Sequence, residues 1–91
     1  MIKQNEFFNG LNFKEYEFKY GSEIKKCFKG SDGGFYRIDH FGNAYVIEFA
    51  ENEEDAKNNI FEDTDTYDDK MEKSRIIELI QSDLKKCVSW L

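Results

Sequence analysis

Proline is absent from this chain of 91 residues, histidine and tryptophan occur once each, and there are only two cysteines. Without proline, the turns of the chain must depend on glycine and asparagine, which tolerate unusual backbone angles. Zinc sites need cysteine and histidine at close spacing, and Cys27, His40 and Cys87 are not closely spaced. The sequence therefore contains no indication of a zinc site, and we expect no cofactor.

Long apolar segments are also absent. No run approaches the roughly 18 apolar residues that a membrane-spanning helix needs. Residues 1–13 contain neither the apolar stretch nor the cleavage site of a signal peptide. We therefore expect a cytoplasmic protein that binds no membrane. In that compartment Cys27 and Cys87 are expected to stay reduced and to pack as small hydrophobic residues, rather than to form a disulfide.

The length and the aromatic content indicate one folded domain, residues 1–91. A chain of this size buries roughly 60–65 % of its unfolded surface, which is enough for one modest core. Nine phenylalanines and five tyrosines bring the aromatic content, with the one tryptophan, to 16 %. That content argues against intrinsic disorder, although 35 % of the residues are charged.

Negative charge is concentrated in residues 48–72. This segment has eleven acidic and two basic residues, so its net charge is −9. Because the whole chain is −6, the other 66 residues sum to +3. Nucleic acids and anionic membranes bind positive surfaces, so this distribution argues against both as direct partners. It favours a basic protein as the partner, with the chain itself a monomer or weak dimer.

Four segments have the composition of β-strands, with aromatic and β-branched residues bounded by turn residues. These segments are residues 13–20, 23–29, 35–39 and 44–50. The first two surround a Gly-Ser turn, which favours a hairpin, although residues 23–29 also fit a helical turn. The last is apolar on both faces until Glu48, which is typical of a strand inside a sheet.

Two short helices and a loop are expected around these strands. Residues 2–9 are predicted to form a helix that ends at Gly10, and Asn52 is predicted to cap a helix over residues 53–60. Acids in the first turn of that second helix complement its dipole. Ile60 and Phe61 are expected to anchor it to the sheet. Residues 62–69 have no apolar period and are predicted to be a surface loop.

The C-terminal segment has the pattern of an amphipathic helix from about residue 70 to residue 89. Asp69 and Glu72 have the spacing of a capping box at its start. Apolar side chains recur there at intervals of three and four, at Ile76, Ile77, Ile80, Leu84, Cys87, Val88 and Leu91. The predicted fold is therefore α+β: a small antiparallel sheet of about four strands, packed against this helix, with a short acidic helix and loop between.

Catalytic and metal motifs are incomplete. Residues 63–68 begin like a calcium-binding loop, but Asp68 and Ser74 stand where such a loop needs glycine and glutamate. His40 has only Cys27 as a conceivable nucleophilic partner, and no motif supports the pair. The glycines of residues 30–34 lack the Gly-Lys-Ser/Thr ending of a phosphate-binding loop. We therefore expect a protein that is not an enzyme and holds no metal.

The acidic segment is the candidate binding surface. A cluster of like charges repels itself, and it is well suited to steering a basic partner towards the site. Tyr67 adds an aromatic side chain of the kind enriched at interface hot spots. The candidate partner-binding residues are Glu54, Asp55, Glu62, Asp63, Asp65, Tyr67, Asp68 and Asp69.

The run GGFYRIDHFGNAYVIEFAENEEDAKNNIFEDTDTYDD, with the apolar helix after it, resembles small immunity proteins of bacterial polymorphic toxin and contact-dependent growth inhibition systems. The resemblance covers about residues 33–85 and consists of a strand, an acidic helix and an acidic segment. It implies a non-enzymatic protein that binds and blocks the toxin domain of its own locus. Many such toxins are nucleases, whose substrate surface must be basic.

A second family has similar features. Phage-encoded inhibitors of nucleic-acid-guided nucleases are also small, acidic α+β proteins, and the segments GNAYVI and ENEE resemble theirs. The sequence leaves both possibilities open. The neighbouring gene separates them, because a toxin gene supports the first and a prophage cluster supports the second.

Overall fold

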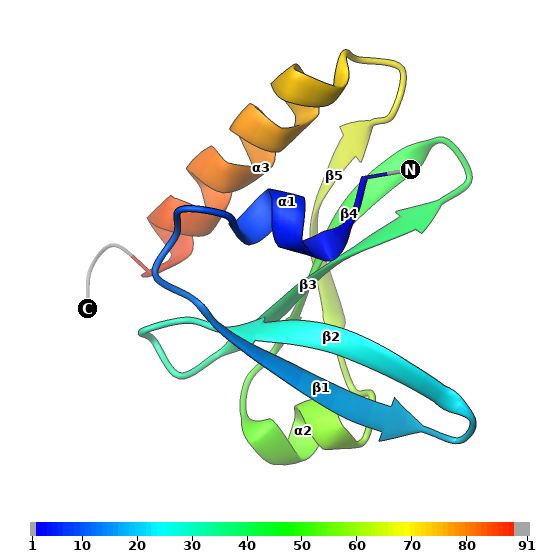
Figure 1. Ribbon diagram of the computed structural model, residues 1–91, viewed down its shortest axis with the longest axis vertical. Helices are drawn as coiled ribbons and strands as arrows, with labels where there is room; N and C mark the ends of the chain where they lie inside the picture. Colours follow the sequence, from blue (N-terminus) through cyan, green and yellow to red (C-terminus); the bar gives the residue numbers. More distant parts are fainter. Residues whose placement is uncertain (1, 89–91) are drawn as a thin grey trace.

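The structure is a computed structural model that describes the backbone of residues 2–88 and the side chains of residues 2–86. Five strands and three helices follow one another along the chain (Figure 1). They are α1 (Gln4–Phe8), β1 (Lys14–Tyr20), β2 (Glu23–Lys29), β3 (Phe35–Phe41), β4 (Ala44–Ala50), α2 (Glu53–Lys57), β5 (Glu62–Asp68) and α3 (Lys73–Val88). The predicted α+β class is therefore confirmed.

The sheet is an antiparallel meander in which each strand pairs with the next, in the order β1-β2-β3-β4-β5. The predicted hairpin of β1 and β2 is present, and Gly21 takes φ +61° in its two-residue turn, where glycine has no steric penalty. β4 lies between β3 and β5, inside the sheet as predicted.

β2 and β3 form an incomplete pair. They pair only at Phe28 with Tyr36 and at Lys29 with Phe35. Beyond these residues the two strands diverge, and Figure 1 shows the β1–β2 hairpin splayed away from β3 and β4. Part of the facing edges of β2 and β3 therefore has no neighbouring strand.

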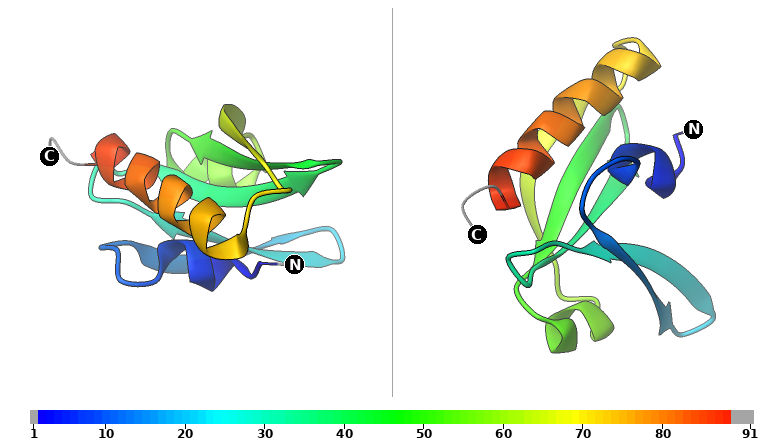
Figure 2. Two further views of the ribbon diagram at one scale, coloured as in Figure 1. Left: turned by 90° about the horizontal axis from the view of Figure 1, so that it is seen from above. Right: turned by 60° about the vertical axis from the view of Figure 1, so that its left-hand side comes forward.

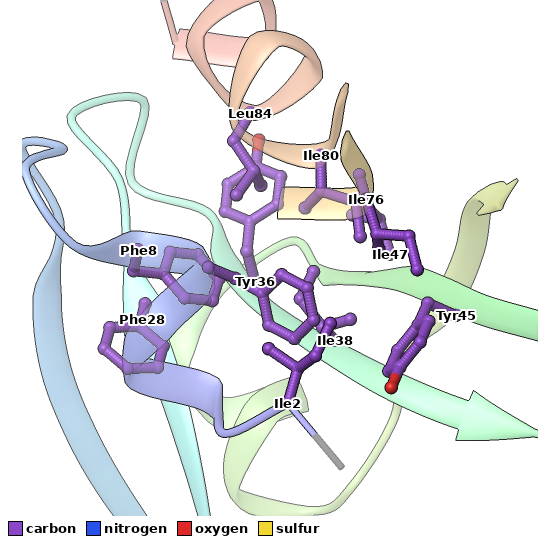
Figure 3. Packing of buried hydrophobic residues seen from close by; sticks show 11 residues of the cluster. Ile2, Phe8, Phe28, Tyr36, Ile38, Tyr45, Ile47, Ile76, Ile80 and Leu84 are labelled. Carbon is purple, nitrogen blue, oxygen red and sulfur yellow. The ribbon is translucent and has the colours of Figure 1, made fainter. Parts of the chain in front are cut away.

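The larger hydrophobic core lies between the sheet, α1 and α3. Ile76, Ile80 and Leu84 point from α3 towards the sheet, and Phe8 of α1 stacks on Phe28 with 4.0 Å between ring centroids (Figure 3). Ile2, Phe7 and Phe8 are all buried, so the apolar side chains of the N-terminal segment face this core.

A smaller core lies on the other face of the sheet, under α2. Ala56 of α2 packs with Cys27 and Phe35, and Phe61 packs against the same cluster. Figure 2 shows α1 and α2 on opposite sides of the sheet. Tyr16 and Phe18 of β1 are partly buried against this cluster.

The segment 62–69 was predicted as a loop, and that prediction is wrong. Residues Glu62–Asp68 form β5, an edge strand paired with β4. β4 has apolar side chains on both faces and can bond backbone groups on both sides, so it accepts a second neighbour despite the acidic sequence of that neighbour.

The predictions for the helix ends need three further corrections. α2 ends at Lys57 rather than at Ile60, because Asn59 takes a left-handed φ of +59°, as residues just after a helix often do. Ile60 is exposed, so of the two predicted anchors only Phe61 packs against the smaller core. α3 begins at Lys73, and Asp69 does not cap it.

The apolar stripe of α3 is confirmed where it is described. Ile76, Ile80 and Leu84 are buried and Ile77 packs at the edge of the core. The side chains of Cys87 and Val88, and Leu91 as a whole, lie outside the described residues. None of the helices within residues 2–88 is long and apolar enough to cross a membrane.

Candidate acidic interface

Four of the predicted acidic binding residues lie together on β5. Glu62, Asp63, Asp65 and Asp68 are all exposed, on the edge strand that closes one side of the sheet. We call these four residues the acidic edge. No lysine, arginine or histidine within the described side chains forms an ion pair with any of them. Their charges are therefore directed to solvent.

The register places the acidic edge on both faces of the sheet. Glu62 and Asp65 lie opposite Phe49 and Ile47, whereas Asp63 lies opposite Glu48. Residues opposite each other in a sheet share a face. The register shifts between Ile47 and Glu48, and near this shift the Thr64 hydroxyl donates to the Ile47 carbonyl at 3.1 Å. Regular alternation places Glu62 and Asp63 on opposite faces, and the shift puts Asp65 on the same face as Glu62.

α2 extends the negative surface beyond the beginning of β5. The Asn52 side-chain oxygen accepts from the Asp55 N–H at 2.9 Å, which confirms Asn52 as the N-cap. Glu54 is exposed and Asp55 is half-buried in the first turn. Figure 1 shows α2 at the opposite end of β5 from the start of α3. Glu54 and Asp55 therefore lie beside the chain segment that leads into the acidic edge.

Tyr67 and Asp69 have structural roles that the sequence analysis did not foresee. Tyr67 is half-buried against the larger core, and its hydroxyl donates to the Asp83 carboxylate of α3. The Asp69 carboxylate accepts a hydrogen bond at 2.8 Å from His40 Nε2, in the histidine tautomer that carries a proton on this nitrogen. Tyr67 is therefore not a free aromatic anchor for a partner, and Asp69 is partly engaged.

His40 links β3 to the end of β5. Its ring stacks on Tyr45 at 4.5 Å between centroids, and it is half-buried beside Asp69. These contacts hold the segment that follows β5 against the β3–β4 hairpin. Twenty-nine residues separate His40 from Asp69, so no local sequence pattern indicates the contact.

A buried ion pair lies next to the acidic edge. Arg37 Nε donates to Glu48 Oε1 at 2.7 Å, and both side chains are only 9 % exposed. The guanidinium carbon lies 3.8 Å from the centroid of the Phe61 ring, which covers the pair. The Nη1 atom of Arg37 is buried without a hydrogen-bond partner. Sequence analysis noted Glu48 as an acid in an apolar strand but did not find this pairing.

Burial raises the pKa of the Glu48 carboxyl, although Arg37 acts in the opposite direction. The negative charges of Asp39 and Asp63 raise this pKa further. Asp63 of the acidic edge is therefore close enough to Glu48 to repel its ionised form. The cluster of negative charge thus extends from the edge of the sheet to the buried pair.

Within the described residues no group of three or more histidine, cysteine, aspartate or glutamate side chains could hold a metal ion. Cys27 is a free, buried thiol, and burial raises its pKa to about 11. Thiolates are the reactive form of cysteine, so the site has no activated nucleophile at this residue. What the acidic edge can do chemically is attract and bind positive charge.

Comparisons with protein-family models, curated proteins and solved structures find no significant match.

Proposed function

We propose that this protein is a toxin-neutralising immunity protein. It binds a basic toxin domain in a stoichiometric complex through the acidic edge, with Glu54 and Asp55 of α2 as its flank. The toxin surface that it covers is one that binds phosphates, as in a nuclease. Protection follows from blocking that surface and involves no catalysis by the immunity protein.

One observation carries this proposal. The four carboxylates of the acidic edge are exposed and have no ion-pair partner within the described side chains. Four unpaired charges of one sign on a seven-residue strand repel one another, so they are unfavourable in the free protein. A basic partner would relieve this repulsion.

Acidic residues on an edge strand also have a structural use. Charged side chains keep edge strands from pairing with other chains. Protection of the edge does not require charges of one sign, and it does not require that the same sign continue onto α2. The concentration of one charge on β5 and α2 therefore favours steering of a partner over edge protection alone.

The proposal is tested with the product of the gene next to the one that encodes this chain. Co-expression should rescue bacteria from that product's toxicity, and purified mixtures should give a complex of fixed stoichiometry by size-exclusion chromatography. Toxicity that persists with full expression of this protein, with no complex, would contradict the proposal.

A variant with His40→Ala separates binding from catalysis. Because His40 lies outside the acidic edge, the variant should still protect the cells and still form the complex. Loss of protection with the complex intact would instead indicate an activity centred on His40.

A further inference from the structure

The side chain of Gln4 occupies a position where a strand is missing from the sheet. Its amide nitrogen donates to the Ile38 carbonyl, and its carbonyl oxygen accepts from the Ile38 N–H at 2.9 Å. A carboxamide has one acceptor and two donors, so it can satisfy both backbone groups of one residue. Gln4 therefore imitates the peptide group of a neighbouring strand.

The register shows which strand is missing. Glu23 of β2 closes the two-residue turn and bonds to β1. Alternate residues of an antiparallel strand direct their N–H and C=O groups to opposite sides, so those of Ile24 and Lys26 point away from β1, towards β3. The ladder between β2 and β3 ends at Phe28 and Tyr36. Two residues further on, Lys26 would lie opposite Ile38 if the ladder continued. Gln4 takes that place on β3, and the β2 edge stays open.

A cleft of about 410 Å³ opens where the two strands diverge. Its walls come from β2, β3 and α1, and the lining residues are Ile24, Lys25, Lys26, Arg37, Ile38, Asp39 and Gln4. Within the described residues, no backbone hydrogen bond joins Ile24 or Lys26 to β3. One wall of the cleft is therefore the edge of β2, where backbone N–H and C=O groups recur at the spacing of a β-strand.

We propose that this cleft binds an extended peptide segment of a partner protein, which adds to the open edge of β2. Addition of a strand to a sheet edge is a common mode of peptide recognition, in which main-chain bonds supply affinity and side-chain contacts supply specificity. This site is separate from the acidic edge, so its failure would leave the proposed function standing.

The walls of the cleft indicate the composition of the segment. Ile24 is 65 % exposed and offers an apolar contact. Lys26 pairs with Glu15 at 3.7 Å, whereas Lys25 has no ion pair within the described side chains, so Lys25 is the cation that a carboxylate of the segment would meet. The segment should therefore combine β-branched residues with at least one acidic residue.

A library of random 12-residue peptides displayed on phage supplies the probe. Peptides selected on the full-length protein, then synthesised, should be rich in β-branched and acidic residues. Ile24→Pro should weaken their binding at least tenfold, because it removes the N–H that the new strand needs. Within the part of the chain that the structure describes, no strand pairs with this N–H, so the substitution breaks no bond of the sheet.

Glu17→Pro is the matched control. The N–H of Glu17 also points away from the β1–β2 ladder, but towards the outer edge of β1. Binding should be unchanged in this variant. Failure to select any binding peptide would overturn the proposal, and so would equal binding by the Ile24→Pro variant.

Hydrogen exchange in the unmodified protein tests the same site without a substitution. The backbone amides of Ile24 and Lys26 should exchange rapidly in the free protein and become protected when a selected peptide is added. Slow exchange of both amides in the free protein would contradict an open edge.

Discussion

Gly34 lies at a position where the packing leaves no room for a Cβ atom. A Cβ atom at this position would clash with Cε1 of the Phe49 ring, and that ring packs against Tyr36 at 5.1 Å between centroids. The ring is therefore not free to move away. At this position glycine is required by close packing between the loop before β3 and the side chains of β4.

Gly34→Ala should lower the free energy of unfolding by about 1–3 kcal/mol, as inserted methyl groups do in packed regions. Chemical denaturation measures this change. Phe49→Leu provides the control, because the double variant should lose less stability than the two single variants together. Exact additivity of the two losses would show that the clash is not the cause.

Cys27 should react slowly with alkylating agents in the folded protein. Its pKa is raised from 9.0 to about 11 by burial, which lowers the thiolate fraction near pH 8 about a hundredfold. The rate of iodoacetamide modification in a Cys87→Ser background measures this directly. A native rate equal to the rate in denaturant would contradict the burial of this thiol.

At the scale of single elements, α3 is held by the apolar residues that face the sheet. Leu84→Ala should lower the free energy of unfolding by about 2–5 kcal/mol, because Leu84 is completely buried. The exposed neighbour Lys85 is the control, and Lys85→Ala should change stability by less than about 0.5 kcal/mol. Similar small effects at both positions would mean that this face of α3 does not pack on the sheet.

In the paired strands β3 and β4, the Glu48 carboxyl should make the free energy of unfolding depend on pH. Its pKa is raised in the folded state, so the folded protein binds this proton more tightly than the unfolded chain does. The free energy of unfolding should therefore fall as the pH rises from about the ordinary glutamate pKa of 4.5 through the raised value. The contribution is constant above that interval.

Urea unfolding between pH 4 and pH 8 measures this dependence, and Glu48→Gln should flatten it. The pKa of Glu6 is lowered by its contact with Lys73, so Glu6 acts below pH 4.5 and with the opposite sign. Glu48 and Glu6 therefore change the free energy of unfolding in different pH ranges. An unchanged slope in the Glu48→Gln variant would assign the pH dependence to other groups.

Most elements of this fold could be predicted from the sequence because their signals are local. The alternation of Tyr16 and Phe18, the turn at Gly21 and the apolar spacing around Ile80 each reflect short-range geometry. β5 could not be recognised in this way, since aspartate and glutamate disfavour strands and an exposed edge needs no apolar period. The best available signal was β4 itself, whose two apolar faces indicate a strand with neighbours on both sides.

The candidate site was predicted only in part for the same reason. The exposed acids of β5 follow from composition, so Glu62, Asp63, Asp65 and Asp68 were found. The hydrogen bonds of Tyr67 and Asp69 join residues far apart in the chain and depend on how α3 and β3 are placed. Contacts of this kind are determined by tertiary packing, and a single sequence does not show them.

At the scale of the whole molecule, the two edges of the sheet carry different balances of charge. β1, β2 and the turn between them carry five lysines and three glutamates, whereas β5 carries four acids and no base. These strands lie at opposite edges of the sheet. A basic partner that approaches by diffusion is therefore turned towards β5 before contact.

This polarity can be tested with two variants of equal net charge. Glu62→Lys with Asp65→Lys changes the acidic edge, and Glu17→Lys with Glu23→Lys changes exposed acids of the other edge. Each pair of substitutions moves the net charge from −6 to −2. Any difference between the variants therefore comes from the position of the charges.

The most direct measurement is the rate of association, as a function of salt concentration, with the toxin domain that the proposed function expects from the neighbouring gene. For the unchanged protein and the Glu17/Glu23 variant, the rate should fall at least about tenfold from low to high salt, as in steered association. For the Glu62/Asp65 variant, the low-salt rate should be lower and nearly independent of salt. Equal rates and equal salt dependence in both variants would contradict the assignment of the acidic edge as the binding surface.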